Sequence, residues 1–212
     1  MKEKSFTLKT ENHSAGAHLL VPNHAKDLGV ILAHGAGGNM NAEFLRFFQK
    51  SIAVAGYPTM RFNFFYSEKG RRAPDPKPLL LACYNKAIET MPGARIVTGG
   101  KSMGGRMASY IADNDRVAGL VFLGYPLHAP GKFDELRDEH LYSISKAMFF
   151  ASGTKDPFAR IDLLKKVLKK IGKNASSFLI PDAGHSFEIG RKNDPAVWKN
   201  VADAIIVWLT RL

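Results

Sequence analysis

The chain has 212 residues, of which 45% are apolar and 23% charged, a composition that is typical of one globular domain and excludes a disordered chain. The sequence has no apolar run of the roughly 18 residues that a membrane-spanning helix needs, so we expect no membrane partner. Its charged N-terminus lacks the apolar stretch of a signal peptide, and the single cysteine, Cys83, has no partner for an intramolecular disulfide. These features predict a cytoplasmic protein.

The formal net charge of +11 suggests either a nucleic-acid surface or a solvated basic exterior. Much of the excess lies at helical spacing within residues 161–173, opposite a row of apolar side chains, in Lys165, Lys166, Lys169, Lys170 and Lys173. No recognised binding motif and no alternation of basic and aromatic residues accompanies these lysines. We therefore interpret them as a solvated face and expect no nucleic-acid partner, although a basic exterior can steer anionic substrates.

Short apolar strands alternate with amphipathic helices along the chain. The sequence predicts a starting hairpin of edge strands at residues 6–8 and 17–21. The further strands are expected, in chain order, at residues 29–33, 59–62, 96–98, 119–123, 147–151 and 177–180. Helices are expected between them at residues 42–55, 78–90, 107–112, 161–171 and 195–212. This order predicts a single α/β domain over residues 1–212, with a mostly parallel central sheet flanked by helices on both faces.

A serine lies at the centre of residues 100–104, which have the sequence Gly-Lys-Ser-Met-Gly. An expected strand precedes this segment and an expected helix follows it, which is the context of a nucleophile elbow. The turn at such an elbow is sharp, and a Cβ at Gly100 or Gly104 would strike the neighbouring strand or helix. Ser102 is therefore the candidate catalytic nucleophile.

An activated serine needs a histidine as base and a carboxylate that orients the histidine. The acid is expected first along the chain, in a loop after a strand, and the histidine after the next strand. Asp156 follows the strand at 147–151, and His185 follows the strand at 177–180. Asp182 is a rival acid. We prefer Asp156 because its strand precedes the strand of the histidine.

The oxyanion that forms during acyl transfer needs two backbone N–H donors. One is expected from Met103, the residue after the nucleophile. The other is expected from the glycine-rich loop 34–39, with Ala36 the first choice and Gly37 the second. A phosphate-binding loop is the alternative interpretation of this segment, but the third glycine of a dinucleotide fingerprint and a Gly-Lys-Ser/Thr ending are both missing. The glycines, Gly35 among them, let the substrate approach the backbone closely.

Three other residues near these motifs call for an interpretation. His34 is expected to order the glycine-rich loop through hydrogen bonds. Lys101 is expected to be a structural or rim residue, with an ion pair to Glu68 or Asp75 as the alternative. Cys83 is interpreted as a buried apolar filler on a helix rather than a nucleophile.

The motifs at 34–37, 100–104, Asp156 and 184–185 occur in the same order as in the α/β-hydrolase superfamily, which the chain resembles over nearly its whole length. Within the superfamily it is similar to the dienelactone-hydrolase-like group. The strings at 99–106 and 124–128 are especially similar to those of small hydrolase-like proteins related to testis-expressed protein 30. Dienelactone hydrolases use a cysteine nucleophile where this chain has Ser102, so their substrate does not carry over.

The resemblance and the motifs together predict a serine hydrolase that cleaves carboxylic esters or thioesters of small substrates through an acyl-enzyme, with no metal ion or organic cofactor. The chain has no long insertion at the usual place of a lid domain. The substrate pocket is expected to include Gly35, Gly37, Phe64, Tyr125 and Leu127. The alternative is a non-catalytic hydrolase-like protein that serves as a binding module or subunit. The oligomeric state and the physiological substrate stay open.

Overall fold

In the computed structural model, which describes residues 1–190 and 192–212, eight strands form one sheet in the order β1-β2-β4-β3-β5-β6-β7-β8. The pairs β1–β2 and β2–β4 are antiparallel, and all other neighbours are parallel. The strands are β1 (Lys2–Lys9), β2 (Ser14–Val21), β3 (Leu28–Ala33), β4 (Thr59–Phe62), β5 (Arg95–Lys101), β6 (Val117–Leu123), β7 (Ala147–Gly153) and β8 (Ala175–Ile180). The expected mostly parallel α/β sheet is confirmed.

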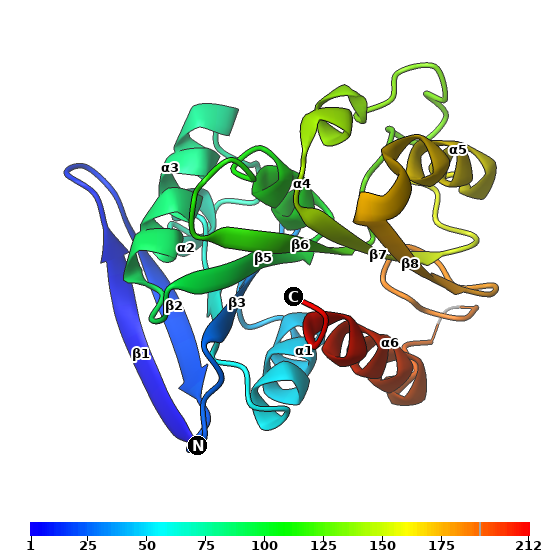
Figure 1. Cartoon of the computed structure of the whole chain (residues 1–212). Coiled ribbons are helices and arrows are strands. Elements are labelled where there is room, and N and C mark those ends of the chain that lie inside the picture. Colours follow the sequence, from blue (N-terminus) through cyan, green and yellow to red (C-terminus); the bar gives the residue numbers. More distant parts are fainter. Residues whose placement is uncertain (191) are drawn as a thin grey trace.

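Helices cover both faces of the sheet, with α1 and α6 on one face and α3, α4 and α5 on the other (Figure 1). The α-helices are α1 (Glu43–Val54), α2 (Phe65–Glu68), α3 (Lys77–Thr90), α4 (Met103–Ser109), α5 (Ile161–Ile171) and α6 (Pro195–Leu209), and two 3₁₀ helices are η1 (Glu139–Ser143) and η2 (Gly172–Asn174). None of these helices is long and apolar enough to cross a membrane.

The two-layered covering follows from side-chain alternation along the buried strands. In β3, Val30 and Leu32 pack in the core under α1 and α6, whereas Ile31 and Ala33 pack in the core under α3, α4 and α5. All four side chains are fully buried. A strand that is apolar on both faces therefore supplies two separate cores, which explains why its sequence is a continuous apolar run.

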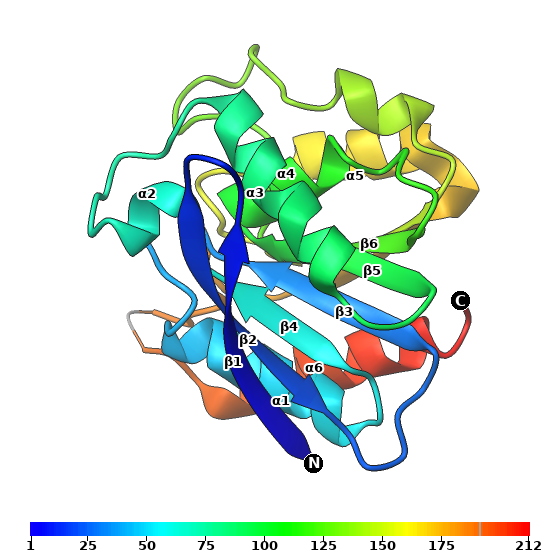
Figure 2. The same cartoon turned by 90° about the vertical axis from the view of Figure 1, so that its left-hand side faces the viewer.

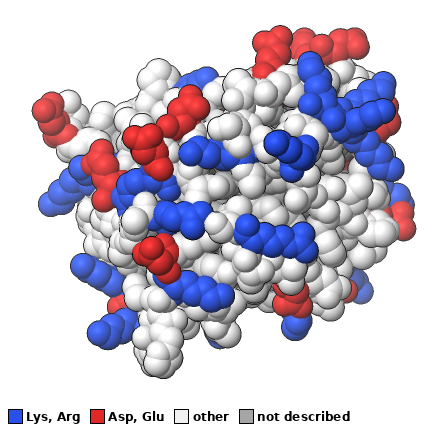
Figure 3. All heavy atoms as spheres, viewed as in Figure 1, with Lys and Arg blue, Asp and Glu red and all other residues white. Residues whose placement is uncertain are grey.

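Helix α5 shows the amphipathic pattern that its sequence predicts. Its apolar residues Leu164 and Val167 are buried. The lysines Lys165, Lys166, Lys169, Lys170 and Lys173 are all exposed. Figure 3 shows Lys and Arg side chains spread over the face that it presents, with a denser group where α5 lies in Figure 1, beside acidic side chains.

The starting hairpin differs from the expected pair of edge strands. Figure 2 shows β1 as the outermost strand of the sheet, and β2 pairs on its other side with β4. The second strand of the hairpin is therefore internal, and its one polar ring, that of His18, is buried with Nδ1 3.2 Å from Gln49 Oε1. Helix α4 begins at Met103, four residues before the predicted start at residue 107. The prediction missed the first turn because that turn contains Gly104 and Gly105, and glycine is a poor helix former.

The parallel strands bring the loops that carry the candidate residues to one edge of the sheet. Loop 34–39 follows β3, Ser102 follows β5, Asp156 follows β7, and loop 181–187 follows β8. Parallel strands end on the same side of the sheet, so loops that are far apart in sequence converge there. The site can therefore be built from these segments.

Candidate active site

Ser102 lies at the junction of β5 and α4 with a positive φ of 49° and a ψ of −115°. Its N–H donates to Leu123 O at 3.1 Å, which ties the turn to β6. A Cβ built on Gly100 would lie 2.1 Å from Ala33 O, and one on Gly104 would lie 2.4 Å from the same oxygen. The turn is thus a strained one that only these two glycines permit, as an exposed nucleophile requires.

His185 and Asp156 form a hydrogen-bonded pair next to this turn. The distance from His185 Nδ1 to Asp156 Oδ2 is 2.7 Å. The Asp156 side chain is fully buried and also accepts the N–H of Phe158 at 2.8 Å, whereas the histidine side chain keeps an exposed fraction of 17%. A carboxylate fixed at two points orients the imidazole and leaves Nε2 free for a proton.

The rival acid, Asp182, lies elsewhere. Its carboxylate pairs with Lys155 Nζ at 2.7 Å, and its side chain is 66% exposed. It has positive φ, at 57°, and serves the turn after β8. Of the two candidate acids, only Asp156 contacts His185.

Ser102 and His185 line the same cavity, which has a volume of about 400 Å³. In the described part of the chain no hydrogen bond joins the Ser102 hydroxyl to the imidazole. Such bonds are often long in unliganded sites and form when substrate binds. The two side chains therefore share a cavity in an arrangement that can close into a triad.

The residues that would supply the two expected oxyanion donors lie beside the serine. Ala36 and Met103 line a cavity together with Ser102. Neither backbone N–H has an acceptor among residues 1–190 and 192–212. The second choice, Gly37, lines neither of the two cavities beside the serine, whereas Gly35 lines the one that contains His185.

His34 orders the glycine-rich loop from within. Its Nδ1 lies 2.8 Å from Gly35 O, and its Nε2 accepts the N–H of Phe64 at 3.1 Å. Burial lowers the pKa of His34 to about 4, so the ring is neutral at pH 7 and can accept that hydrogen bond. The expectation that His34 is an organising residue agrees with this geometry.

Lys101 takes neither of the partners that the sequence suggested. Its ammonium donates to the backbone carbonyl of His185. Glu68 instead accepts from Gly16 N at 3.0 Å, and Asp75 pairs with Arg71. Burial lowers the pKa of Lys101 to about 8, against the attraction of nearby carboxylates. Lys101 thus ties the nucleophile turn to the loop of the histidine. The sequence could not predict this contact, because it joins two loops that are far apart along the chain.

The expected aromatic pocket is corrected by the structure. Phe64, Tyr125 and Leu127 are fully buried and pack in the core under α3, α4 and α5. They come shortly after the ends of β4 and β6, and their side chains fill the layer beneath the helices rather than the cavity. Tyr125 and Leu127 instead hold the backbone of Arg137. Tyr125 Oη donates to Arg137 O at 2.8 Å, and Arg137 N donates to Leu127 O at 2.8 Å.

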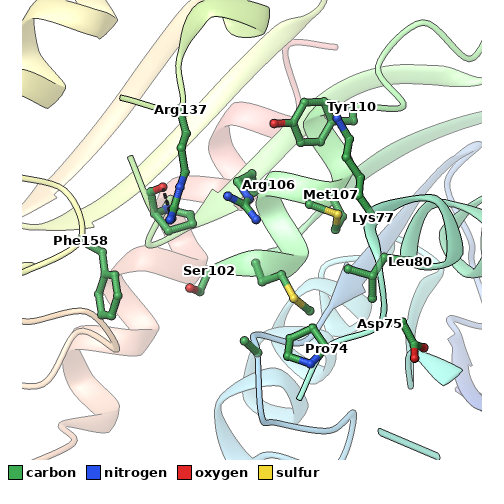
Figure 4. Close-up of a pocket in the computed structure, with 13 residues that line it drawn as sticks. Pro74, Asp75, Lys77, Leu80, Ser102, Arg106, Met107, Tyr110, Arg137 and Phe158 are labelled. Atoms are coloured by element: carbon green, nitrogen blue, oxygen red, sulfur yellow. Dashed lines mark hydrogen bonds between the residues drawn. The ribbon is translucent and has the colours of Figure 1, made fainter. Parts of the chain in front are cut away.

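A second cavity, of about 490 Å³, opens on the other side of Ser102 (Figure 4). Three basic side chains that the sequence does not mark as site residues line it, namely Lys77, Arg106 and Arg137. These residues come from α3, from α4 and from the segment between β6 and η1. Within the described ranges, no group of three His, Cys, Asp or Glu side chains could hold a metal ion.

The fold is that of a known class of protein. A family model described as an alpha/beta hydrolase domain matches residues 26–210, and the chain therefore belongs to the α/β-hydrolase family. Among curated proteins, it is 32% identical over 101 residues to acyl-protein thioesterase 1 of Neurospora crassa. That match covers 45% of this chain and only 41% of the relative.

Solved structures share the fold over nearly the whole chain. A dienelactone hydrolase from Anabaena variabilis has a TM-score of 0.79 at 19% identity, and the match covers 99% of this chain and 97% of that one. An α/β serine hydrolase homologue from Coxiella burnetii has a TM-score of 0.78 at 17% identity, covering 99% and 98%. A lid-less α/β serine hydrolase from Xanthomonas campestris also has a TM-score of 0.78, at 16% identity, covering 99% and 94%. These likenesses establish the lid-less single-domain architecture.

Proposed function

We propose that this α/β hydrolase is a serine hydrolase that cleaves carboxylic esters or thioesters of small acyl groups. The observation that carries the proposal is the buried Asp156–His185 pair, 2.7 Å apart, which opens onto the cavity that Ser102 lines from its strained turn. Folding alone demands neither a buried carboxylate on this imidazole nor a serine at positive φ.

The reaction follows from these positions. Ser102 Oγ attacks the acyl carbon while His185 Nε2 takes the hydroxyl proton, and Asp156 holds the tautomer that leaves Nε2 free. The tetrahedral intermediate collapses when the bond to the leaving oxygen or sulfur breaks and His185 returns the proton to that atom. Water then adds to the acyl-enzyme by the same route, which releases the acid and restores the serine.

The developing oxyanion would accept hydrogen bonds from the N–H groups of Ala36 and Met103, which have no other acceptor in the described part of the chain. One such donor is worth about 3 kcal/mol in comparable enzymes. No step requires a metal ion or an organic cofactor.

The names of two similar proteins support an ester or thioester as the bond that is cleaved. The Neurospora relative is named a thioesterase, and a structure named as an esterase from Pyrococcus furiosus shares the fold with a TM-score of 0.77 at 20% identity. The narrower kinship with proteins related to testis-expressed protein 30, and a cytoplasmic location, belong to the same proposal.

The test is turnover of p-nitrophenyl butyrate by the wild-type protein and by Ser102→Ala. We expect the variant to lose about three orders of magnitude or more in kcat, because triad members act as a unit. A matched control is Ser177→Ala, whose side chain is exposed on β8 and lines a cavity beside α6 that contains none of the triad residues. Equal rates for wild type and Ser102→Ala would overturn the proposal.

A further inference from the structure

Two cavities flank the nucleophile, and they differ in chemistry. Both are lined by Ala36, Ser102 and Phe158. His185 lines only the cavity of about 400 Å³, together with residues of loop 34–39 and of α1. The cavity of about 490 Å³ lies towards α3 and α4 instead. A substrate bound at the serine can place one half in each.

The position of the histidine decides which half goes where. The leaving group receives its proton from His185, so it must lie on the side of the imidazole. That side is the cavity of about 400 Å³. The acyl half then extends into the cavity of about 490 Å³, which has no contact with His185.

The acyl cavity is basic. Lys77, Arg106 and Arg137 line it, and none of the three forms an ion pair in the part of the chain that the structure describes. Figure 4 shows the guanidinium groups of Arg106 and Arg137 on the same side of the cavity, beyond Ser102. Lys77 instead lies over the ring of Tyr110, with Nζ 3.2 Å from the ring centroid.

Arg106 is the least satisfied of these cations. Its Nε is buried and has no hydrogen-bond partner among the described residues. Among the described residues, the guanidinium of Arg137 makes a single, long hydrogen bond, from Nη1 to Pro126 O at 3.4 Å. Burial and the neighbouring Arg106 charge lower the pKa of Arg137. Two adjacent guanidinium groups with free donors are the arrangement that recognises a carboxylate or a phosphate.

The other titratable groups at this cavity do not cancel the positive charge. The one carboxylate in the lining, Asp75, pairs with Arg71 and lies at the Pro74 end, away from Arg137 (Figure 4). His140 is packed on the Tyr110 ring, and burial together with nearby cations lowers its pKa to about 4, so it is neutral at pH 7.

We propose, on the basis of the serine hydrolase function proposed above, that the acyl half of the substrate carries a carboxylate that Arg106 and Arg137 bind. The substrate class is then a monoester or monothioester of a short dicarboxylic acid. Lys77 adds a third positive charge at the rim of the cavity. The pair of arginines acts as a specificity site, separate from the nucleophile and its base.

The kinetic test compares two p-nitrophenyl esters with the same acyl chain. One is mono-p-nitrophenyl adipate, and the other is its methyl ester, which lacks the free carboxylate. We expect wild type to prefer the free acid by about tenfold or more in kcat/KM, the value of one charged hydrogen bond. Arg106→Met and Arg137→Met should each bring the ratio of the two kcat/KM values close to one.

A matched control removes a cation far from the cavity. Lys199 is exposed on α6 and pairs with Asp203 at 2.6 Å. Lys199→Met should keep both the activity and the ratio, which separates a local contact from the effect of net charge. A wild-type enzyme that hydrolyses both esters equally would overturn the acyl-carboxylate proposal while leaving the hydrolase function intact.

A binding measurement distinguishes a failure of the acyl-carboxylate proposal from a failure of the proposed hydrolase function. Calorimetric titration of Ser102→Ala with monomethyl adipate and with dimethyl adipate needs no turnover. We expect the monoacid to bind about tenfold or more tightly, and Arg106→Met to remove that difference. Equal binding of the two compounds, or no binding of either, contradicts the proposal even if the protein proves to be no esterase.

A phosphate on the leaving group is the alternative source of anionic oxygen. Butyryl coenzyme A and S-butyryl-N-acetylcysteamine share an acyl group and differ in the phosphates of the leaving group. We expect any preference between these two thioesters to be unaffected by Arg137→Met. A preference for the coenzyme A thioester that disappears in Arg137→Met would place the leaving group among the arginines and overturn the assignment.

Discussion

At the scale of single residues, the two aspartates near His185 have opposite environments. Asp156 is buried and hydrogen-bonded to the imidazole, whereas Asp182 is exposed and paired with Lys155. We predict that Asp156→Asn reduces kcat by about 10³ to 10⁴, because the amide favours the wrong tautomer of the imidazole. Asp182→Asn should change kcat by less than about twofold, since exposed pairs contribute little.

Steady-state kinetics on the two variants, with circular dichroism to verify folding, checks this prediction. If Asp182→Asn were the more damaging change, the acid would be misassigned, although Ser102 and His185 would keep their roles.

Lys101 gives a prediction for the pH dependence of stability. Its pKa is lowered from 10.5 to about 8 by burial, so between these values the unfolded chain holds a proton that the folded chain lacks. The free energy of unfolding therefore rises with pH across this window, by up to about 3 kcal/mol, relative to Lys101→Met. Urea unfolding of both proteins near pH 7 and pH 10 measures the difference. A gap that stays constant with pH would contradict it.

At the scale of elements, the turn from β5 into α4 concentrates the strain of the site. Helix propensity alone predicts that Gly104→Ala stabilises α4 by about 1 kcal/mol. The structure predicts the opposite sign, because the added Cβ would lie 2.4 Å from Ala33 O. We expect a loss of about 1–3 kcal/mol or more in unfolding free energy, measured by urea denaturation. A stabilised variant would show that the turn has more room than the structure gives it.

Some helices and strands could be predicted from the sequence, and others could not. Apolar runs and helical spacing locate β3, β4, β6 and α5 closely, because buried strands and amphipathic helices leave periodic signals. The positions of Ser102, Asp156 and His185 could be predicted as a candidate site because the functional residues of a parallel sheet gather in the loops at the carboxyl ends of its strands.

The residues that line the basic cavity show no periodic pattern in the sequence. Arg137 reaches it from an irregular segment, which has no periodicity, and Arg106 lies on a helix whose start is hidden by glycines. Phe64 was misplaced for a related reason, since an aromatic residue after a strand can turn into the core or into a cleft. Only the packing of neighbouring elements decides which.

At the scale of the whole molecule, the net charge of +11 is spread over the surface, with an exposed group on α5. We predict no mobility shift of duplex DNA at about 150 mM salt and micromolar protein, conditions in which dedicated DNA-binding proteins bind without sequence specificity. A shift that falls steeply with salt, and that is lost when Lys165, Lys166 and Lys169 are changed to Gln, would contradict the interpretation of α5 as a solvated face.

The central claim is that His185, held by Asp156, activates Ser102. Labelling of the purified protein with a fluorophosphonate probe, followed by peptide mapping, tests it most directly because the probe reacts with activated serines and needs no knowledge of the substrate. We predict a single adduct on Ser102, and a large loss of labelling rate in His185→Ala. An unlabelled Ser102 at saturating probe, or labelling that is independent of His185, would contradict the account.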